Sequence, residues 1–375
     1  MDNPRLTVVQ TLPALNVGGV ERGTVDVATE LVRRGHRAIV ISKGGRLVEE
    51  LKDNGVEHIA LGIGEKSLFT LRHVAFLRKL LHDNQADILH TRSRLPAWIS
   101  YLAWKGMDHE ARPHFITSVH GPYTVNAYSK IMTRGENIIA ISEFIKDYIL
   151  KNYPETNERK ITVIPRGIDT QKFFHGFQPQ TEWLNQWQSE HPALKDKFLI
   201  TLPARITRWK GQEDFLRIIA LLKARNIKIH GLIAGGAEKR QMKFLEELKQ
   251  FSIDKNISND VTFLGQRNDL REVMAVSNLI LSLAKEPEAF GRTALEALGL
   301  GIPVVAYDHG GASEVLSKIF PEGRVMPNNI EAVARLIERF CNAPPAVPDK
   351  NPFTLKKMLD ETLDLYESCI LPTHV

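Results

Sequence analysis

Cysteine is scarce in this chain, and so are the segments that mark exported or membrane-spanning proteins. Only Cys341 and Cys369 occur among the 375 residues. Their separation fits neither a zinc site nor a redox pair, so we expect reduced thiols and a cytoplasmic protein. No apolar run approaches the roughly 20 residues that a membrane-spanning helix needs. An apolar segment follows the start of the chain with no basic stretch before it, so we expect no secretory signal.

The sequence also lacks Asp-X-Asp pairs and any strong excess of one charge. Without such a pair nothing obvious holds a divalent ion, so we expect no metal and no other cofactor. The net charge of +5 is modest, and we expect no nucleic-acid partner. Residues 1–170 hold 23 basic residues against 19 acidic ones, and 8 of the 13 histidines. This excess is either scatter or the mark of an N-terminal half that meets an anionic surface, such as phospholipid headgroups.

Apolar, strand-like segments alternate with helix-like segments along most of the chain. We expect strands at 6–10, 38–42, 88–90, 115–119, 138–142, 161–164, 198–202, 228–234, 261–264, 279–283 and 302–306. Strands that alternate with helices predict parallel sheets covered on both faces. We therefore expect an α/β fold with two doubly wound domains, residues 1–170 and 171–352, facing a common cleft. A last helix within 353–375, after a Pro-rich linker, is expected to cross back to the first domain.

One expected helix, at residues 72–82, has apolar residues on one side and Arg72, Arg78 and Lys79 on the other. An ordinary crossover helix explains this pattern well. Docking of the helix on a membrane surface is the alternative.

Two glutamates, with seven residues between them, span a predicted loop-to-helix junction. The stretch KEPEAFGRTALEALGLGIPVV places Glu288 in the loop and Glu296 about one turn inside the helix. Backbone N–H groups around Gly291 have no partner within the helix and can hold an anion. Carboxylates only accept hydrogen bonds, so they suit hydroxyl groups. A ligand that carries both a phosphate and a polyol, such as a nucleotide-sugar, matches this pattern.

Two further groups of residues suit phosphate. Arg205 and Lys210 follow the strand at 198–202, where they could neutralise a diphosphate; solvated surface cations are the alternative. Gly18 and Gly19 follow the first strand and let backbone N–H groups approach a phosphate, although the loop is not a GxGxxG sequence.

Polar residues also follow two strands of the first domain, and ligands of open α/β sheets bind beyond the carboxyl ends of strands. His120 ends the strand at 115–119, which fits a catalytic histidine or a structural one equally. Arg92 and Arg94 flank a serine after the strand at 88–90. They suit a phosphate or carboxylate on a second substrate, with a solvated loop as the alternative.

Together these segments resemble the retaining GT-B glycosyltransferases of family 4, of the bacterial lipopolysaccharide-core and mannosyltransferase type. The matching segments follow the family's order along nearly the whole chain: Gly18-Gly19-Val20-Glu21, His120-Gly121, VIPRGID at 163–169, Arg205 with Lys210, Glu288 to Glu296, and PVVAYDHGGASEV at 303–315. The two glutamates with the Gly-x-Pro-Val-Val strand after them are the most specific part. Two residues depart from the family pattern, Ala289 in place of a glycine and Arg166 in place of an asparagine.

The resemblance implies a role for each matching residue. Glu296 would hold the ribose hydroxyls and Glu288 those of the donor sugar. Arg205 and Lys210 would bind the diphosphate, and His120 would contact the donor sugar near its reacting carbon. His120, Arg205, Lys210 and Glu288 are therefore the expected catalytic residues. Backbone groups of Gly18, Gly19, Phe290, Gly291 and Arg292 would complete the donor site.

The resemblance also implies the reaction. It would be transfer of a sugar from a GDP- or UDP-linked donor to a glycan or glycolipid acceptor, with retained configuration and without a metal. Lipopolysaccharide or other cell-envelope synthesis would be the setting, with peripheral contact to the cytoplasmic face of the inner membrane. A nucleotide-sugar epimerase on the same fold and a non-catalytic nucleotide-sugar-binding module are the alternatives.

Overall fold

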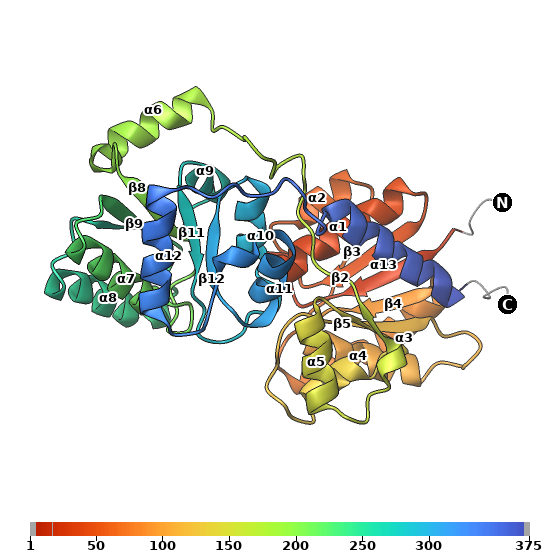
Figure 1. The fold of residues 1–375 in the computed structure, drawn as a ribbon. Coiled ribbons are helices and arrows are strands. Elements are labelled where there is room, and N and C mark those ends of the chain that lie inside the picture. Colours follow the sequence, from red (N-terminus) through yellow and green to blue (C-terminus); the bar gives the residue numbers. More distant parts are fainter. Residues whose placement is uncertain (1–4, 17, 371–375) are drawn as a thin grey trace. The chain divides into compact units, whose positions relative to one another are not determined.

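The structure, a computed structural model, describes residues 5–16 and 18–370. The chain divides into two compact units, residues 1–165 with 356–375 and residues 166–355 (Figure 1). We call them the N-terminal unit and the C-terminal unit. Each is built on its own parallel sheet, so the expected pair of doubly wound α/β domains is confirmed.

The sheet of the N-terminal unit has seven strands in the order β3-β2-β1-β4-β5-β6-β7. All neighbouring strands in it are parallel. The strands are β1 (Thr7–Thr11), β2 (Arg37–Ser42), β3 (Glu57–Ala60), β4 (Ile88–Thr91), β5 (His114–Val119), β6 (Asn137–Ala140) and β7 (Ile161–Val163). The sequence pattern does not predict β3, because this edge strand is largely exposed and lacks the apolar run of a central strand.

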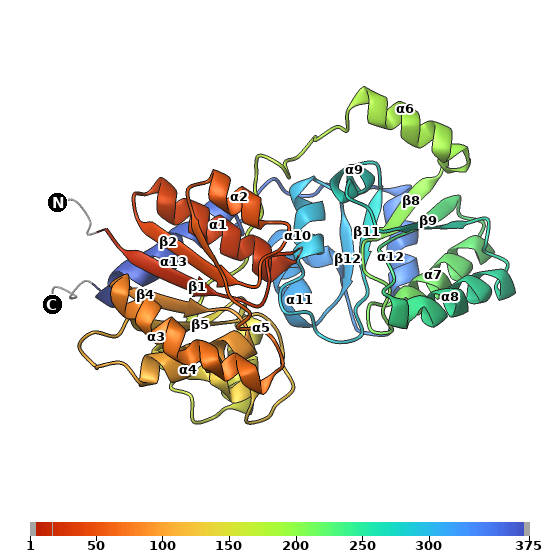
Figure 2. The same cartoon turned by 180° about the vertical axis from the view of Figure 1, so that it is seen from behind.

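Helices of the N-terminal unit cover its sheet. They are α1 (Gly19–Arg33), α2 (Val48–Asp53), α3 (His73–Asp83), α4 (Arg94–Lys105), α5 (Glu143–Asn152) and α13 (Leu355–Ile370), with short 3-10 helices η1 (Leu68–Arg72), η2 (Ser129–Thr133) and η3 (Glu158–Lys160). Figure 2 shows α3 and α4 side by side. Leu77, Ile99 and Phe115 belong to one buried cluster, which joins these two helices to the sheet.

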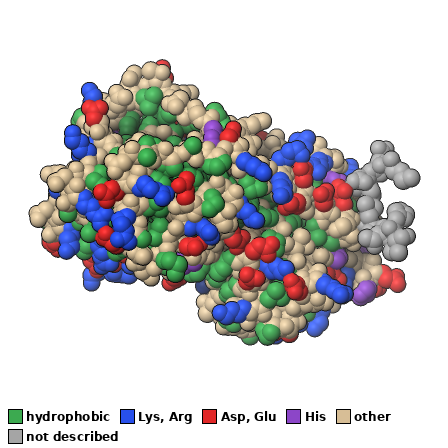
Figure 3. Space-filling view, viewed as in Figure 1, with side chains coloured by type: hydrophobic (Ala, Val, Ile, Leu, Met, Phe, Trp, Pro, Cys, Tyr) green, Lys and Arg blue, Asp and Glu red, His purple; other side chains and the backbone are tan. Residues whose placement is uncertain are grey.

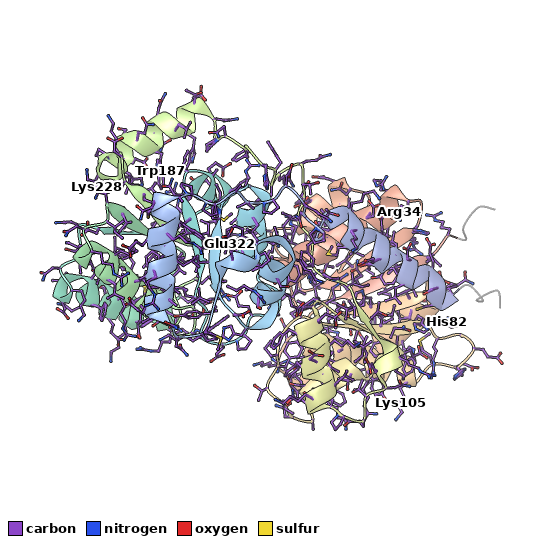
Figure 4. The ribbon with its side chains drawn as sticks, in the orientation of Figure 1. Arg34, His82, Lys105, Trp187, Lys228 and Glu322 are labelled. Atoms are coloured by element: carbon purple, nitrogen blue, oxygen red, sulfur yellow. The ribbon has the colours of Figure 1, made fainter. Side chains whose placement is uncertain are left out.

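Helix α13 binds the N-terminal unit through polar as well as apolar contacts. The hydroxyl of Tyr366 lies 2.6 Å from Nδ1 of His90, and both side chains are fully buried. At the surface, Arg34 forms an ion pair with Asp360 of α13 (Figure 4). The end of the chain therefore completes the unit with which the chain begins.

The C-terminal unit has a six-stranded parallel sheet in the order β10-β9-β8-β11-β12-β13. Its strands are β8 (Phe198–Leu202), β9 (Ile229–Ala234), β10 (Val261–Gly265), β11 (Leu279–Ser282), β12 (Val304–Tyr307) and β13 (Arg324–Val325). Its helices are α6 (Thr181–Glu190), α7 (Gln212–Ala224), α8 (Met242–Asp254), α9 (Leu270–Ala275), α10 (Arg292–Gly299), α11 (Gly310–Ile319) and α12 (Ile330–Asn342), with 3-10 helices η4 (Pro192–Leu194), η5 (Lys239–Gln241) and η6 (Pro321–Gly323).

Helices α6 and α11 are absent from the sequence-based expectations. Helix α11 begins with two glycines, which have poor helix propensity, so its formation depends on packing of Val315 and Leu316. Helix α6 is held by Trp187, which packs in a cluster with Leu199 and Leu232 (Figure 4). In both cases tertiary contacts outweigh a weak local signal.

Candidate active site

The predicted donor residues lie at one edge of the C-terminal sheet. Arg205 and Lys210 follow β8, and Glu288 and Glu296 follow β11. Strands β8 and β11 are parallel neighbours, so the loops after them leave the same edge side by side. This edge is the usual ligand-binding side of an open α/β sheet.

Lys210 and Glu288 form the central ion pair of this edge. The Lys210 Nζ lies 2.6 Å from Glu288 Oε1, and their side chains are only 19% and 15% exposed. The Nζ also lies 4.3 Å from the ring centroid of Trp209. Gly211 follows with φ +80°, and a Cβ there would meet the backbone oxygen of Leu283 at 2.1 Å. The loop can therefore pass this close to β11 only with glycine at this position.

Glu296 lies one turn inside α10, as predicted, and its side chain is buried. Arg292 Nε donates to Glu296 Oε1 at 2.8 Å. Burial raises the pKa of the Glu296 carboxyl, and the nearby Arg292 guanidinium partly opposes that rise. The helix begins after Gly291, whose φ is +81°. A Cβ on Gly291 would lie 2.5 Å from the Cα of Ala312, so only glycine fits at this position.

A second layer of polar residues, missed by the sequence analysis, joins the two loops. Asp214 is buried in the first turn of α7, where it accepts a hydrogen bond of 2.8 Å from the hydroxyl of Tyr307. The Lys285 Nζ lies 3.5 Å from Asp214, and the Lys285 backbone N–H donates to Trp209 O at 2.7 Å. An aspartate at a position where the helix faces the core was the signal that could have revealed this layer.

The loop of Glu288 is also fixed by α11. The backbone N–H of Gly311 donates to the Glu288 carbonyl at 2.7 Å. His309, just before this helix, places Nε2 2.7 Å from the carbonyl oxygen of Ala284. The segment DHGG therefore supports the site through hydrogen bonds to the neighbouring loop.

Arg205 differs from Lys210, although both follow β8. Its side chain is 73% exposed, and the carboxylate 3.6 Å away belongs to Glu238 on the same surface. Its carbonyl oxygen accepts from Gln212 Nε2 at 2.9 Å, so the backbone is held while the guanidinium is exposed. The structure brings Lys210 and Glu288 together, and the role of Arg205 stays a prediction.

In the N-terminal unit the predicted residues follow β1, β4 and β5. Gly18 caps α1 and Gly19 is its first residue, so the helix N-terminus follows the carboxyl end of β1. His120 follows β5 and is half-buried, and its backbone N–H donates to the Tyr123 hydroxyl at 3.4 Å. The roles of these residues toward a donor stay predictions.

The two arginines after β4 have different surroundings, and neither lies in a solvated loop. Arg92 is 3% exposed, and its Nε donates to Gln10 Oε1 at 2.9 Å. Burial lowers the pKa of the Arg92 guanidinium. Arg94 is only half-buried and begins α4. Arg92 therefore supports the end of β4 from within, Arg94 alone is accessible, and contact of these residues with a second substrate stays a prediction.

Comparison with known proteins decides the family. The model of Glycosyltransferase Family 4 matches residues 17–172, and the model of Glycosyl transferases group 1 matches residues 185–351. The chain belongs to this glycosyltransferase family. A glycosyltransferase of Rickettsia africae is 31% identical, with a TM-score of 0.85 over 98% of this chain and 100% of that one. The expected resemblance and the GT-B fold are thus confirmed.

Two curated relatives of this glycosyltransferase extend the comparison. An uncharacterised glycosyltransferase of Methanocaldococcus jannaschii is 26% identical over 87% of this chain and 86% of its own length. A lipopolysaccharide core biosynthesis mannosyltransferase of Rhizobium meliloti is 31% identical over 42% of this chain and 43% of its own length. Membership of the family favours sugar transfer over the two alternatives, an epimerase and a silent binding module.

Proposed function

We propose that this glycosyltransferase transfers a sugar, with retention of configuration, from a nucleotide-sugar to a glycolipid of the lipopolysaccharide-core type. The observation that carries the donor half is the Lys210–Glu288 pair beside the first turn of α10. The similarity to a lipopolysaccharide core mannosyltransferase supports the acceptor half. Metal-free catalysis in the cytoplasm is part of the same proposal.

Lys210 and Glu288 have complementary tasks in the proposed reaction. The ammonium group of Lys210 stabilises the negative charge that develops on the leaving diphosphate, which is the largest effect available in a site shielded from water. Glu288 accepts hydrogen bonds from hydroxyls of the donor sugar, and Glu296 accepts those of the ribose. Arg205, whose side chain is exposed, adds a second cation as the diphosphate leaves.

Retention follows from the proposed course of the proton. The leaving phosphate oxygen takes the proton of the acceptor hydroxyl on the face from which it departs, so the new bond forms on that same face. No covalent glycosyl-enzyme takes part in this scheme. Isolation of such an adduct, for example by mass spectrometry after reaction with the donor alone, would refute it.

A basic and apolar surface supports contact with a membrane. Phe69, Leu71 and Phe76 are 78%, 51% and 49% exposed on η1 and α3, among the exposed cations Arg72 and Lys79. We call these five residues the η1–α3 surface. Aromatic and basic side chains together suit the headgroup region of an anionic bilayer. Within residues 5–16 and 18–370, no helix is long and apolar enough to cross a membrane.

The donor half is tested by thermal denaturation with UDP, GDP and ADP. A nucleotide that binds the native protein raises its midpoint of unfolding, and the tightest raises it most. We expect one of these nucleotides to do so, and its sugar conjugates then serve as donors for transfer to purified lipopolysaccharide core. If none changes the midpoint, the nucleotide-sugar proposal fails. A new nucleotide-sugar formed from donor alone would indicate the epimerase instead.

A further inference from the structure

We propose that Arg94, held between the rings of Tyr123 and Tyr128, binds a phosphate or carboxylate group on the acceptor sugar. This inference rests on the proposed function and names the chemical class of its second substrate, an acidic sugar. We call Arg94, Tyr123, Tyr128 and Ser129 the arginine clamp. The clamp lies in the N-terminal unit, at the ends of the neighbouring strands β4 and β5.

Aromatic rings fix the guanidinium of Arg94. Its Cζ lies 4.8 Å from the ring centroid of Tyr123 and 5.4 Å from that of Tyr128. One N–H of Arg94 donates to the hydroxyl of Ser129 at 3.1 Å, and Ser129 is buried. An arginine held in this way loses little side-chain entropy when a ligand binds. Less of the free energy of its hydrogen bonds is therefore offset than for a freely rotating arginine.

Both tyrosines are themselves anchored by neighbouring helices. Trp98 of α4, one turn after Arg94, donates from Nε1 to the Tyr128 carbonyl at 3.0 Å. Tyr148 of α5 donates its hydroxyl to the Tyr123 carbonyl, and burial raises the pKa of Tyr148 to about 12. The loop between β5 and η2 is therefore held at both tyrosines, although most of its side chains are exposed.

The charge of Arg94 has no counterion on the described part of the chain. Across residues 5–16 and 18–370, no carboxylate lies within 4.0 Å of its guanidinium. Arginine has five N–H donors, and the clamp uses one of them. Lys210 and Arg292 at the donor edge differ from Arg94, because each of them contacts a glutamate. A half-exposed, fixed and unneutralised guanidinium is suited to bidentate recognition of phosphate or carboxylate.

The clamp is joined to His120 through Tyr123. The Tyr123 ring lies against Arg94, and its hydroxyl accepts from the backbone N–H of His120. His120 is the residue of this unit expected to contact the donor sugar near the reacting carbon. The side chain of Tyr123 therefore lies between His120 and Arg94, where the anion is proposed to bind. An acceptor that fits carries its anionic group on the same sugar ring as the attacking hydroxyl, or on the adjoining ring.

Binding of simple sugars tests the clamp without knowledge of the full acceptor. Affinities of glucose 6-phosphate, glucuronate, methyl glucoside and inorganic phosphate are measured by calorimetric titration of the whole chain. We expect at least one acidic sugar to bind about ten-fold more tightly than methyl glucoside, the size of one charge-assisted hydrogen-bonded contact. Whichever of phosphate and carboxylate binds better identifies the acidic group.

Arg94→Met should abolish this preference, and Arg94→Lys should keep only part of it, because a lysine lacks the planar fork. Arg159→Met is the matched control. Arg159 is exposed on η3, and its substitution removes the same charge from the same unit. Tyr128 acts through Arg94 as a positioning residue. Tyr128→Phe keeps the ring and should leave the preference intact, whereas Tyr128→Leu should reduce it about three-fold.

Three results would overturn the proposal. They are equal binding of acidic and neutral sugars to the natural chain, an unchanged preference in Arg94→Met, and inorganic phosphate binding as tightly as glucose 6-phosphate. The nucleotide panel on Arg94→Met keeps the two proposals apart. In that variant the nucleotide shift should persist while the sugar preference is lost. In the natural chain, a nucleotide shift without any sugar preference refutes the clamp alone, and a missing shift refutes the donor proposal.

Discussion

The cations at the carboxyl ends of the strands have carboxylate partners in one unit and aromatic partners in the other. In the C-terminal unit the half-buried Lys210 and the more exposed Arg292 each contact a glutamate, Glu288 and Glu296 respectively. In the N-terminal unit Arg94 is held by aromatic rings and has no carboxylate near it on the described part of the chain.

This difference bears on what each unit recognises. In the proposed reaction, Glu288 neutralises Lys210 again when the diphosphate leaves, so the ion pair favours release of the diphosphate as well as its binding. A fixed cation without a counterion instead gains most when the ligand brings the negative charge. The face shown in Figure 3 offers no such contrast, because basic and acidic side chains are interspersed over it. Four changes would break or sharpen the comparison.

The largest effect is expected from Lys210→Met. The substitution removes a cation at the leaving diphosphate and leaves the Glu288 carboxylate without its partner, so kcat/KM for transfer should fall about 100-fold or more. Steady-state transfer assays measure this. Lys243→Met, which removes an exposed charge from α8, is the control. Unchanged transfer in Glu288→Gln would show that this pair is not the catalytic centre.

Glu296→Gln should weaken nucleotide binding about ten-fold, because an amide is a poorer acceptor for ribose hydroxyls. Burial raises the pKa of Glu296, so keeping it ionised at neutral pH costs folding free energy, and the variant should keep or gain thermal stability. In the natural chain, affinity should fall as pH drops through this raised pKa, and the variant should lose that dependence. Calorimetric titration over pH measures both effects.

The control for Glu296 is Glu322→Gln, which changes an exposed glutamate of the same unit (Figure 4). If the control loses affinity equally, or the pH dependence survives in Glu296→Gln, the carboxylate is not a ribose ligand.

The double variant Phe69→Ser, Phe76→Ser should reduce binding to phosphatidylglycerol vesicles by about ten-fold, since each exposed ring contributes apolar area to the bilayer interface. Vesicle co-sedimentation measures this, and transfer to a water-soluble acceptor should be unaffected. Ile253→Ser, at a side chain 56% exposed on the C-terminal unit, is the matched control. If the natural chain bound neutral phosphatidylcholine vesicles equally well, Arg72 and Lys79 would not contribute to membrane binding.

The last change, Tyr366→Phe, is expected to affect folding stability and not the transfer reaction. The substitution removes the buried hydroxyl that hydrogen-bonds with His90 and Arg92, so these side chains lose a partner. The free energy of unfolding should fall by about 1 to 3 kcal/mol. Scanning calorimetry should place this loss in the N-terminal unit, because a nucleotide should still stabilise the C-terminal unit to the same extent. Tyr101→Phe is the control, and an equal loss there would show that the network adds nothing specific.

Local sequence patterns predicted most of the fold and part of the site. Strand β8 begins and ends where the apolar pattern placed it, and α13 lies within the predicted range 353–375. The positions of Glu288 in a loop and Glu296 one turn into a helix also followed from sequence, because glycine and helix-forming residues mark that junction. Helix α11 did not, since its glycines depend on packing for their helical conformation.

By itself, then, the sequence determined two doubly wound α/β units, their order, and the residue types at the ends of their strands. These features depend on local propensity and on the spacing of apolar residues. Only the tertiary structure decided which of those residues meet. The pairing of Lys210 with Glu288 depends on β8 lying beside β11. Arg92 is buried at the end of β4, whereas Arg94 lies against the rings of Tyr123 and Tyr128. Contacts between residues so far apart in the chain leave no trace in local periodicity, so the sequence could not show that the two arginines have different surroundings.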